Sequence, residues 1–439
     1  MTSATLILLL VLLGFVVILL GVPVYASLGV VGTVSLIALS LTKGTALSWL
    51  VVPSSLYNGA TQIVLLAIPF YILAGEIMNR GGITKKLIDF ALLLIGKMPA
   101  SLAQANIVAS MFFGGITGSA QADTSCIGGI LIPAMIDEGY TPEEAIGVTV
   151  SSSTCGPIIP PSIMMVVFGV AVGCSIGGLF MGGFVPGIMI GLGLMLMVAI
   201  RDRKHHFPRR TEKLTAAQKK KVIIDGLLPL GMPVIIFGGI MGGVFTATEA
   251  GAAAVAYSLI VSLFVTKTLK VKDIPPMLLN AATMSATVLL IISCAKIFSY
   301  ALTALQMSRI MADLILSITQ NRYIFLLLVN ILLLIMGMFM DGSAAVILLA
   351  PILTPIASAL GISVIHFGVI MVLNLVIGAG TPPLGACLFI GCKIGNVPVE
   401  RGVRGIFPYL ISEIIVLLIV TYLPFTVELL PTLLGYAVR

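Results

Sequence analysis

Two short stretches of the sequence combine helix-breaking residues with polar side chains inside apolar surroundings. The first is STCGPIIPPS, residues 153–162, and the second is IGAGTPPLGA, residues 377–386. Proline removes a backbone N–H and frees the carbonyl four residues before it, while glycine lets the backbone approach a ligand closely. Freed carbonyl oxygens suit a small cation, and the helix N-terminus that follows offers N–H groups to an anion. Each stretch is therefore a candidate site for a cation and an anion together; a kink filled by neighbouring helices is the alternative.

Few polar groups accompany these breaks, and their types narrow the chemistry. Around the first break and the segment before it they are Ser119, Gln121, Asp123, Thr124, Ser151, Ser152, Ser153, Thr154 and Ser162. Around the second they are Asp341, Ser343, Asn374 and Thr381. Hydroxyl, amide and carboxylate groups fit Na⁺ and an organic acid, but without His they do not fit a Zn²⁺ or Fe site. Asp123 and Asp341 are the strongest candidates, because a carboxylate at membrane depth is costly and usually functional. A hairpin cap that faces water is the alternative for both.

The composition places these groups in a membrane protein. The chain has 439 residues, of which 59% are hydrophobic and 9% charged, whereas a soluble protein has about 25% charged residues. The apolar run TLILLLVLLGFVVILLGV near the start is interpreted as a helix that stays rather than a signal peptide, because no basic segment precedes it. No G-x₄-G-K-[ST] motif for ATP and no HExxH or Ser-His-Asp pattern occurs. The six cysteines form no CxxC pair and are expected to be buried thiols.

Apolar runs of spanning length recur along the chain. They lie roughly at residues 4–21, 23–42, 61–78, 178–200, 227–245, 250–266, 281–301, 323–340 and 405–425. Other runs, at 86–96, 106–116 and 127–136, are too short, since ten helical residues reach about 15 Å in a hydrocarbon core about 30 Å thick. Two such half-spans joined by a polar tip form a re-entrant hairpin, and GGITGSAQADT, residues 114–124, is the expected tip.

The two breaks belong to a duplicated unit. Aligning Pro160-Pro161 with Pro382-Pro383 gives an offset of 222 residues, which also superposes six further Gly or Pro positions without gaps. The pairs are Gly115 and Gly337, Pro133 and Pro355, Gly139 and Gly361, Gly156 and Gly378, Gly169 and Gly391, and Pro186 and Pro408. Coincidences of this number are hard to obtain by chance, so we expect each unit to contain one hairpin and one broken helix.

Charge predicts that the two units are inverted in the membrane. Residues 201–221 hold nine Lys or Arg residues, which is typical of a cytoplasmic loop, while the segments MTSAT and 423–439 have almost none. The first unit, residues 1–200, is expected to carry a hairpin at about 104–137 and a broken helix at about 141–173. The second, residues 222–439, is expected to carry them at about 323–360 and 363–392. An all-α polytopic fold with an inverted-topology repeat, and with both termini periplasmic, is the prediction; secondary transporters commonly have this architecture.

Five further charged residues lie in or near apolar runs and are interpreted as structural. They are Glu76, Asp225, Glu249, Lys296 and Glu413. Pairing between helices, or snorkelling of the side chain to the interface, is favoured for them over contact with a ligand.

The motifs together resemble those of the large membrane (M) subunit of tripartite ATP-independent periplasmic (TRAP) transporters. They are LLAIPFYILAGEIMNRGGI (65–83), GSAQADTSCIGGILIPAM (118–135), STCGPIIPPS, GGVFTATEAG (242–251), MDGSAAVILLAPILTPIASALGI (340–362) and GAGTPPLGACLFIGC (378–392). The resemblance covers nearly the whole chain. It implies a Na⁺-coupled importer of organic acid anions, such as C4-dicarboxylates, sialic acids or sugar acids, that moves a core of hairpins as an elevator against a scaffold. It also implies a bacterial inner-membrane location, two or more co-transported Na⁺ ions, and no organic cofactor.

The resemblance also implies partners and site residues. The partners would be a small four-helix membrane subunit and a periplasmic substrate-binding protein. The residues expected to bind Na⁺ are Ser119, Asp123, Ser152, Thr154, Gly156 and Pro157 in the first unit and Asp341, Gly342, Gly378, Gly380 and Thr381 in the second. The residues expected to contact the substrate between the two tips are Ser119, Ser162, Asp341 and Ser343.

Two other functions stay open from the sequence. A passive anion pore could use the same hairpins without Na⁺. A membrane-embedded enzyme could act on lipid-linked substrates through Asp123 and Asp341, but it would need a metal ion or a base between them.

Overall fold

The computed structural model describes residues 22–43, 50–96, 98–208, 215–304, 320–383 and 385–436, and these form α-helices and short helical turns without a β-strand. Eight helices within these ranges are long and apolar enough to cross a membrane. Many large apolar side chains on them are exposed, for example Leu196 at 62% and Val234 at 67%. An apolar surface of this extent is stable in lipid and not in water. The prediction of an all-α polytopic membrane protein is therefore confirmed.

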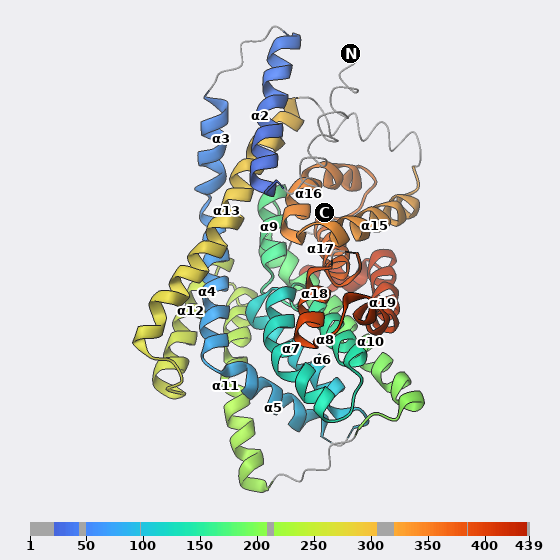
Figure 1. Cartoon of the computed structure of the whole chain (residues 1–439). Coiled ribbons are helices and arrows are strands. Elements are labelled where there is room, and N and C mark those ends of the chain that lie inside the picture. Colours follow the sequence, from blue (N-terminus) through green and yellow to red (C-terminus); the bar gives the residue numbers. More distant parts are fainter. Residues whose placement is uncertain are drawn as a thin grey trace.

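One group of helices forms an elongated wall on the left of Figure 1. Its members are α2 (Val24–Lys43), α3 (Val51–Ala60), α4 (Ala67–Arg80), α11 (Ala216–Met241), α12 (Ala247–Ile260) and α13 (Ile274–Ala304). The long helix α13 packs along α2 and α3 and reaches α4. We call this set the wall group. The helix α5 (Ile83–Ile95) runs across the lower end of the molecule and leads from the wall to the rest of the chain.

The second group is compact and contains both candidate breaks; we call it the core group. It comprises α6 (Ser101–Thr117), α7 (Ala120–Asp137), α8 (Pro142–Ser152), α9 (Ile163–Val172), α10 (Ile176–His205), α15 (Arg322–Phe339), α16 (Gly342–Ala359), α17 (Val364–Gly380), α18 (Ala386–Ile394), α19 (Val399–Tyr422) and α20 (Phe425–Leu433). Helices distant in sequence pack together here, for instance α8 against α19 and α10 against α20. The core group therefore interleaves the two halves of the chain.

Helix bounds in the two halves follow the offset of 222 residues. This shift carries both ends of α7, at Ala120 and Asp137, onto both ends of α16, at Gly342 and Ala359. It also carries the start of α8 onto the start of α17, and the end of α9 onto the end of α18. The helix pairs α6–α7 and α15–α16 occupy the predicted hairpins, while α8–α9 and α17–α18 flank the predicted breaks. The inverted orientation of the two units stays a prediction.

Most expected spans coincide with helices, and two differences stand out. The run at residues 4–21 lies outside the described residues. The basic segment 201–221 is not a loop throughout, because α10 continues to His205 and α11 begins at Ala216. Thr215 and Gln218 form a reciprocal capping box that starts α11 inside this segment, and such caps stabilise a helix start. The basic residues of this segment therefore did not indicate where α10 ends and where α11 begins.

Backbone contacts between glycines set the position of each hairpin arm against its break. A Cβ atom on Gly114 in α6 would lie 2.8 Å from the Cα of Gly156, just after the first helix ends. In the second unit a Cβ on Gly378 would lie 2.6 Å from the Cα of Gly337 in α15. Real Cβ atoms do not approach other atoms this closely, so only glycine allows these crossings.

Candidate functional site

The two hairpin tips and the first break meet at a cavity of about 430 Å³ between the wall group and the core group. Its core-side lining includes Ser119, Pro157, Asp341, Gly342 and Ser343. Its wall side is lined by Val24 and Tyr25 of α2, Ile72 of α4, and Met284, Thr287, Val288 and Ile291 of α13. The tips, 222 residues apart in sequence, therefore face the same space. A small polar molecule there would contact hydroxyl and carboxylate groups on one side and mostly apolar side chains on the other.

The first tip is held against the break by Gly118 and Ser119. Gly118 has a left-handed backbone with φ of 62°, and a Cβ atom on it would lie 2.3 Å from the carbonyl oxygen of Pro161. Ser119 then begins α7 by accepting a hydrogen bond from the N–H of Ala122 at 3.4 Å. Glycine is favoured at such a position because it has no Cβ. The Ser119 side chain, half-buried, lines the cavity.

The second tip presents a carboxylate. Asp341 caps α16, and its Oδ1 accepts hydrogen bonds from the N–H groups of Ser343 at 2.9 Å and Ala344 at 3.3 Å. A negative side chain at a helix N-terminus is stabilised by the helix dipole. The residue is exposed where it lines the cavity. Asp341 is thus a fixed acidic group whose orientation is set by the helix it caps.

A chain of buried polar side chains lies behind the first tip. The Asn106 amide donates to Thr149 at 2.6 Å, and Ser152 contacts both the Asn106 oxygen at 3.3 Å and Ser110 at 3.0 Å. Thr124 contacts Ser153 at 2.7 Å. Asn106, Ser110 and Thr149 were not among the residues selected from the sequence. The spacing of Asn106 and Ser110, one helical turn apart, was a signal that could have found them.

Two acidic residues flank this chain in the interior. The Asp123 side chain is fully buried, and neither carboxylate oxygen has a hydrogen-bond partner among the described residues. Glu413 of α19 is 3% exposed, and its Oε1 accepts a hydrogen bond from the Thr154 hydroxyl at 2.8 Å. Glu413 was expected to pair two helices, and it does so, but the partner is one of the predicted Na⁺ ligands. A buried carboxylate without a basic neighbour requires a cation or a proton for stability.

The second break has a shorter polar chain. The Asn374 amide donates to the Asn330 oxygen at 2.9 Å, and the Asn330 amide donates to Thr421 at 3.0 Å. The Asn374 oxygen is buried without a partner among the described atoms. The Thr381 hydroxyl donates a hydrogen bond to the carbonyl of Ile377 at 2.7 Å. The offset of 222 aligns Asn374 with Ser152, so both polar chains include the same position of the repeat.

The predicted residues thus separate into two sets. Those that line the cavity are Ser119, Pro157, Asp341, Gly342 and Ser343. Those that lie in the interior behind it are Asp123, Ser152, Thr154, Gly156, Ser162, Gly378, Gly380 and Thr381. Ser162 accepts a hydrogen bond from the N–H of Met165 at 3.2 Å and begins α9. Its observed contact is a helix cap, and it does not line the tip cavity.

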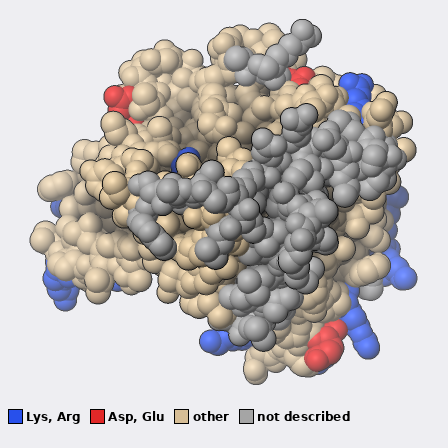
Figure 2. All heavy atoms as spheres, turned by 90° about the horizontal axis from the view of Figure 1, so that it is seen from above, with Lys and Arg blue, Asp and Glu red and all other residues tan. Residues whose placement is uncertain are grey.

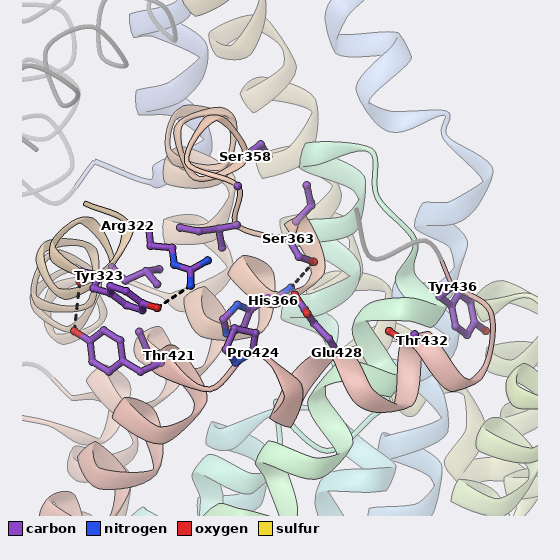
Figure 3. A pocket seen from close by; sticks show the side chains of 15 residues that line it. Arg322, Tyr323, Ser358, Ser363, His366, Thr421, Pro424, Glu428, Thr432 and Tyr436 are labelled. Atoms are coloured by element: carbon purple, nitrogen blue, oxygen red, sulfur yellow. Dashed lines mark hydrogen bonds between the residues drawn. The ribbon is translucent and has the colours of Figure 1, made fainter. Parts of the chain in front are cut away.

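A larger cavity of about 920 Å³ opens at the upper end of the core group, beside the loop between α16 and α17 (Figure 3). Arg322, Tyr323, His366, Tyr422 and Glu428 contribute to its lining, together with Ser358, Ser363 and Val364. The guanidinium of Arg322 donates to the Tyr323 hydroxyl at 2.7 Å. We call it the outer cavity.

The remaining charged residues have structural contacts, with one exception, although not all of these contacts join two helices. Glu76 pairs with Arg80 at 2.8 Å, and Asp225 pairs with Lys86 at 3.4 Å. Glu249 forms a capping box with Thr246 at the start of α12. The exception is Lys296 of α13, which lines a third cavity between the wall and core groups. Among the described residues, no group of three or more His, Cys, Asp and Glu side chains could hold a metal ion.

Comparisons with known proteins show the family of this chain. Residues 10–426 match the family model described as "Tripartite ATP-independent periplasmic transporter, DctM component". The sialic acid TRAP transporter large permease protein SiaM of Vibrio cholerae is 37% identical, covering 95% of this chain and 96% of that protein. The C4-dicarboxylate TRAP transporter large permease protein DctM of Pseudomonas aeruginosa is 38% identical, covering 93% and 94%.

One solved structure shows the fold alone. The Alcanivorax borkumensis YdaH transporter, described as having an unusual topology, superposes with a TM-score of 0.59 at 14% identity, covering 84% of this chain and 86% of that one.

Proposed function

This chain belongs to the DctM component family of tripartite ATP-independent periplasmic transporters, and on that premise we propose that it is the membrane subunit that carries organic acid anions inward together with Na⁺. The family match covers residues 10–426, and the relatives just described match over nearly their full length. The chain is a transport protein and not an enzyme.

The observation that carries the proposal is the meeting of both hairpin tips at one cavity. Ser119, Asp341 and Ser343 line it on the core side, and α2, α4 and α13 of the wall close the other side. Polar residues in membrane proteins usually mark the path of a solute when they line such a space. A solute bound there contacts both helix groups, which is what alternating access requires.

Na⁺ would bind next to the breaks, where backbone carbonyls lose their helical partners. In the first unit the residues proposed to hold it are Ser119, Asp123, Ser152, Thr154, Gly156 and Pro157. In the second unit they are Asp341, Gly342, Gly378, Gly380 and Thr381. The buried oxygens of Asp123, and that of Asn374 one helical turn before Gly378, have no hydrogen-bond partner among the described residues; this supports the assignment, because an ion would satisfy them. Two sites imply at least two ions per cycle.

The organic acid would bind between the tips, close to Ser119, Asp341 and Ser343. Its carboxylate would lie near the bound Na⁺ ions, which offset the charge of Asp341. The role proposed for Ser162 is to cap α9 and so to position this helix. Sequential binding of cations and anion then gives a core group with little net charge, which can slide past the wall as an elevator.

The substrate class follows from the relatives and from the tip chemistry. The relatives are described as permeases for sialic acid, C4-dicarboxylates and 2,3-diketo-L-gulonate, and all are organic acids with several oxygens. We propose a substrate of this class here. The partners would be a periplasmic substrate-binding protein and a small four-helix membrane subunit. This chain covers 67% of a relative described as "Sialic acid TRAP transporter permease protein SiaT" and 63% of one described as "Isethionate TRAP transporter permease protein DctMQ".

The complex would lie in the bacterial inner membrane. The nine basic residues between 201 and 221 would be cytoplasmic. The opposite end of the core group, with the outer cavity and Tyr436, would then be periplasmic.

Uptake into proteoliposomes tests the proposal. The vesicles would contain this chain with its small membrane subunit, and uptake of sialic acid, succinate and 2,3-diketo-L-gulonate would be measured with and without an inward Na⁺ gradient and the cognate binding protein. Uptake that requires both supports the proposed importer. Uptake that requires neither contradicts it and indicates a passive anion pore.

A further inference from the structure

We propose that Lys296 and Thr354 form an anion-binding subsite between the outer cavity and the hairpin tips, selective for a hydroxylated organic acid. The inference rests on the proposed function for its biological meaning, but the site itself is defined by geometry. Lys296 was interpreted as structural from the sequence, and its surroundings favour a ligand instead.

The subsite is a cavity of about 390 Å³ between α13 of the wall and α9 and α16 of the core. Apolar side chains dominate its lining, including Val167, Val170, Ile292 and Ile347. The polar exceptions are Lys296, Ser299, Thr303, Thr354 and Ser358. Lys296 is the one charged residue among the described residues of the lining. An ammonium group in an otherwise apolar membrane cavity attracts an anion strongly, because the low dielectric weakens screening.

Lys296 has no acidic partner within the described part of the chain, and no ion pair involves it. Its aliphatic stem passes beside Gly59 of α3, where a Cβ atom would lie 3.2 Å from the Lys296 Cγ. The absence of a side chain at Gly59 therefore leaves room for the lysine stem. An unpaired cation is costly among apolar helices, so water or an anion must balance it.

Thr354 supplies a second, independent observation. Its side chain is 2% exposed, and its hydroxyl has no hydrogen-bond partner among the described residues. Other helical threonines of this chain bond to the carbonyl four residues earlier, as Thr149 does at 2.7 Å. A buried hydroxyl without a partner costs about 1–3 kcal/mol. A carboxylate oxygen in the cavity would accept a hydrogen bond from Thr354 and from the Lys296 ammonium.

The α16 side of the cavity offers acceptors as well as a donor. Pro351 and Pro355 both lie inside α16 and line the cavity. Because proline has no N–H, the carbonyls of Ile347 and Pro351 lose their helical partners. Those carbonyls can accept hydrogen bonds from hydroxyl groups. A ligand with one carboxylate and several hydroxyls, such as a sugar acid, matches this combination better than a plain dicarboxylate does.

The cavity also lies between the two other cavities. Along α13 the tip cavity is lined by Met284 to Ile291, and the Lys296 cavity follows from Ile292 to Thr303. At the other end it shares Ser358 and Val364 with the outer cavity of Figure 3. Figure 2 shows the upper face hollowed. An anion entering from that face would reach the Lys296 subsite before the tips.

Uptake kinetics of the full complex test the subsite. In Lys296→Gln the substrate concentration for half-maximal uptake should rise about tenfold, which is the loss of one charge-assisted hydrogen bond, while the maximal rate changes less than about twofold. Lys296→Arg should keep the wild-type value. Thr354→Val should raise the half-saturating concentration several-fold, and Lys272→Gln, an exposed lysine shortly before α13, is the matched control. Unchanged half-saturation in both Lys296→Gln and Thr354→Val would overturn the proposal.

A binding measurement keeps the inference independent of transport. In Ser299→Cys, which lines the same cavity and keeps Lys296, the introduced thiol is modified with a methanethiosulfonate reagent, and the modified peptide is quantified by mass spectrometry. Sialic acid or 2,3-diketo-L-gulonate should slow this modification more than succinate does, and none of the three should slow it in Lys272→Cys. Protection in a complex that shows no Na⁺-driven uptake would support the subsite and contradict the proposed function. Uptake by the wild type without protection of the thiol would contradict the subsite alone.

Discussion

The Thr154 hydroxyl donates a hydrogen bond to the carboxylate of Glu413 at 2.8 Å, although 259 residues separate the two in sequence. Thr154 belongs to the turn that ends α8, and Glu413 lies in the middle of α19. The first break therefore receives an acidic group from the opposite half of the chain. The carboxylate is 3% exposed and has no basic partner among the described residues.

Glu413→Gln should weaken the Na⁺ dependence of uptake. The amide keeps an acceptor for Thr154 but removes the negative charge that would attract a cation to the first break. We expect the Na⁺ concentration for half-maximal uptake to rise at least about fivefold, close to 1 kcal/mol, with the thermal midpoint of the complex nearly unchanged. Glu400→Gln, an exposed position in the first turn of α19, is the control. An identical Na⁺ response in Glu413→Gln and Glu400→Gln would leave Glu413 a purely structural residue.

Asp341→Asn should strongly reduce Na⁺-dependent uptake while the complex still assembles. Asparagine can replace aspartate as the cap of α16, since both accept hydrogen bonds from the first N–H groups. The change thus removes the charge at the tip and little else, and we expect at least a tenfold loss of uptake. Asp341→Ala should also lose about 1 kcal/mol of stability with the cap. Wild-type uptake in Asp341→Asn would remove this carboxylate from the mechanism.

Gly378→Ala should destabilise the core group, because the new Cβ atom would lie 2.6 Å from the Cα of Gly337. Overpacking of this kind costs about 1–3 kcal/mol, and the backbone on the other side cannot rotate away as a side chain would. A lower thermal midpoint and a smaller yield of folded protein in detergent are the expected results. Gly129→Ala in α7 is the control, since nothing lies within 4 Å of its Cβ position. Equal stability of the two variants would contradict the close crossing.

Arg201→Met should destabilise the lower end of the core group more than Arg401→Met does. The Arg201 guanidinium donates three hydrogen bonds to Glu144, of 2.8 Å, 3.1 Å and 2.5 Å. Glu144 is 4% exposed and also accepts a hydrogen bond from Tyr409. Removing the arginine leaves a buried carboxylate unpaired, which costs about 3 kcal/mol. Arg401 pairs with Glu143 at a site where its side chain is 54% exposed, so its loss should cost under about 1 kcal/mol. Thermal unfolding of the two variants measures the difference, and similar midpoints would argue against a buried pair.

Glycine and proline positions allowed much of the fold to be predicted. The breaks after Ser152 and Gly380, and the tips at Ser119 and Asp341, follow from residues that change the backbone itself. Such residues act within a few positions, so their effect can be read locally. The same local logic did not fix the ends of α10 and α11, where His205 and Ala216 lie inside a segment taken for a loop.

The division between cavity-lining and interior residues could not be predicted in the same way. Thr154 and Ser162 are interior, whereas Ser119 and Ser343 reach the tip cavity. Helices buried in lipid and protein are apolar on every side, so their sequence pattern does not indicate which side faces a solute. Contacts such as those of Glu413 and Lys296 depend on helices from distant parts of the chain, and no spacing along the sequence reports them.

If Na⁺ binds at the two breaks as proposed, the glycine crossings at Gly114 and Gly378 bear on ion selectivity. At each crossing the two backbones are in direct contact, so no change of side-chain rotamer can alter the distance between the helices. The carbonyl groups next to the crossing therefore stay at fixed separations. A preorganised ring of oxygens loses little entropy when an ion enters. It also cannot expand around a larger ion without moving whole helices. The selectivity for Na⁺ over K⁺ at these breaks would then depend on how rigidly the helices are held. A substitution that loosens either glycine crossing would reduce this selectivity before Na⁺ binding itself is lost.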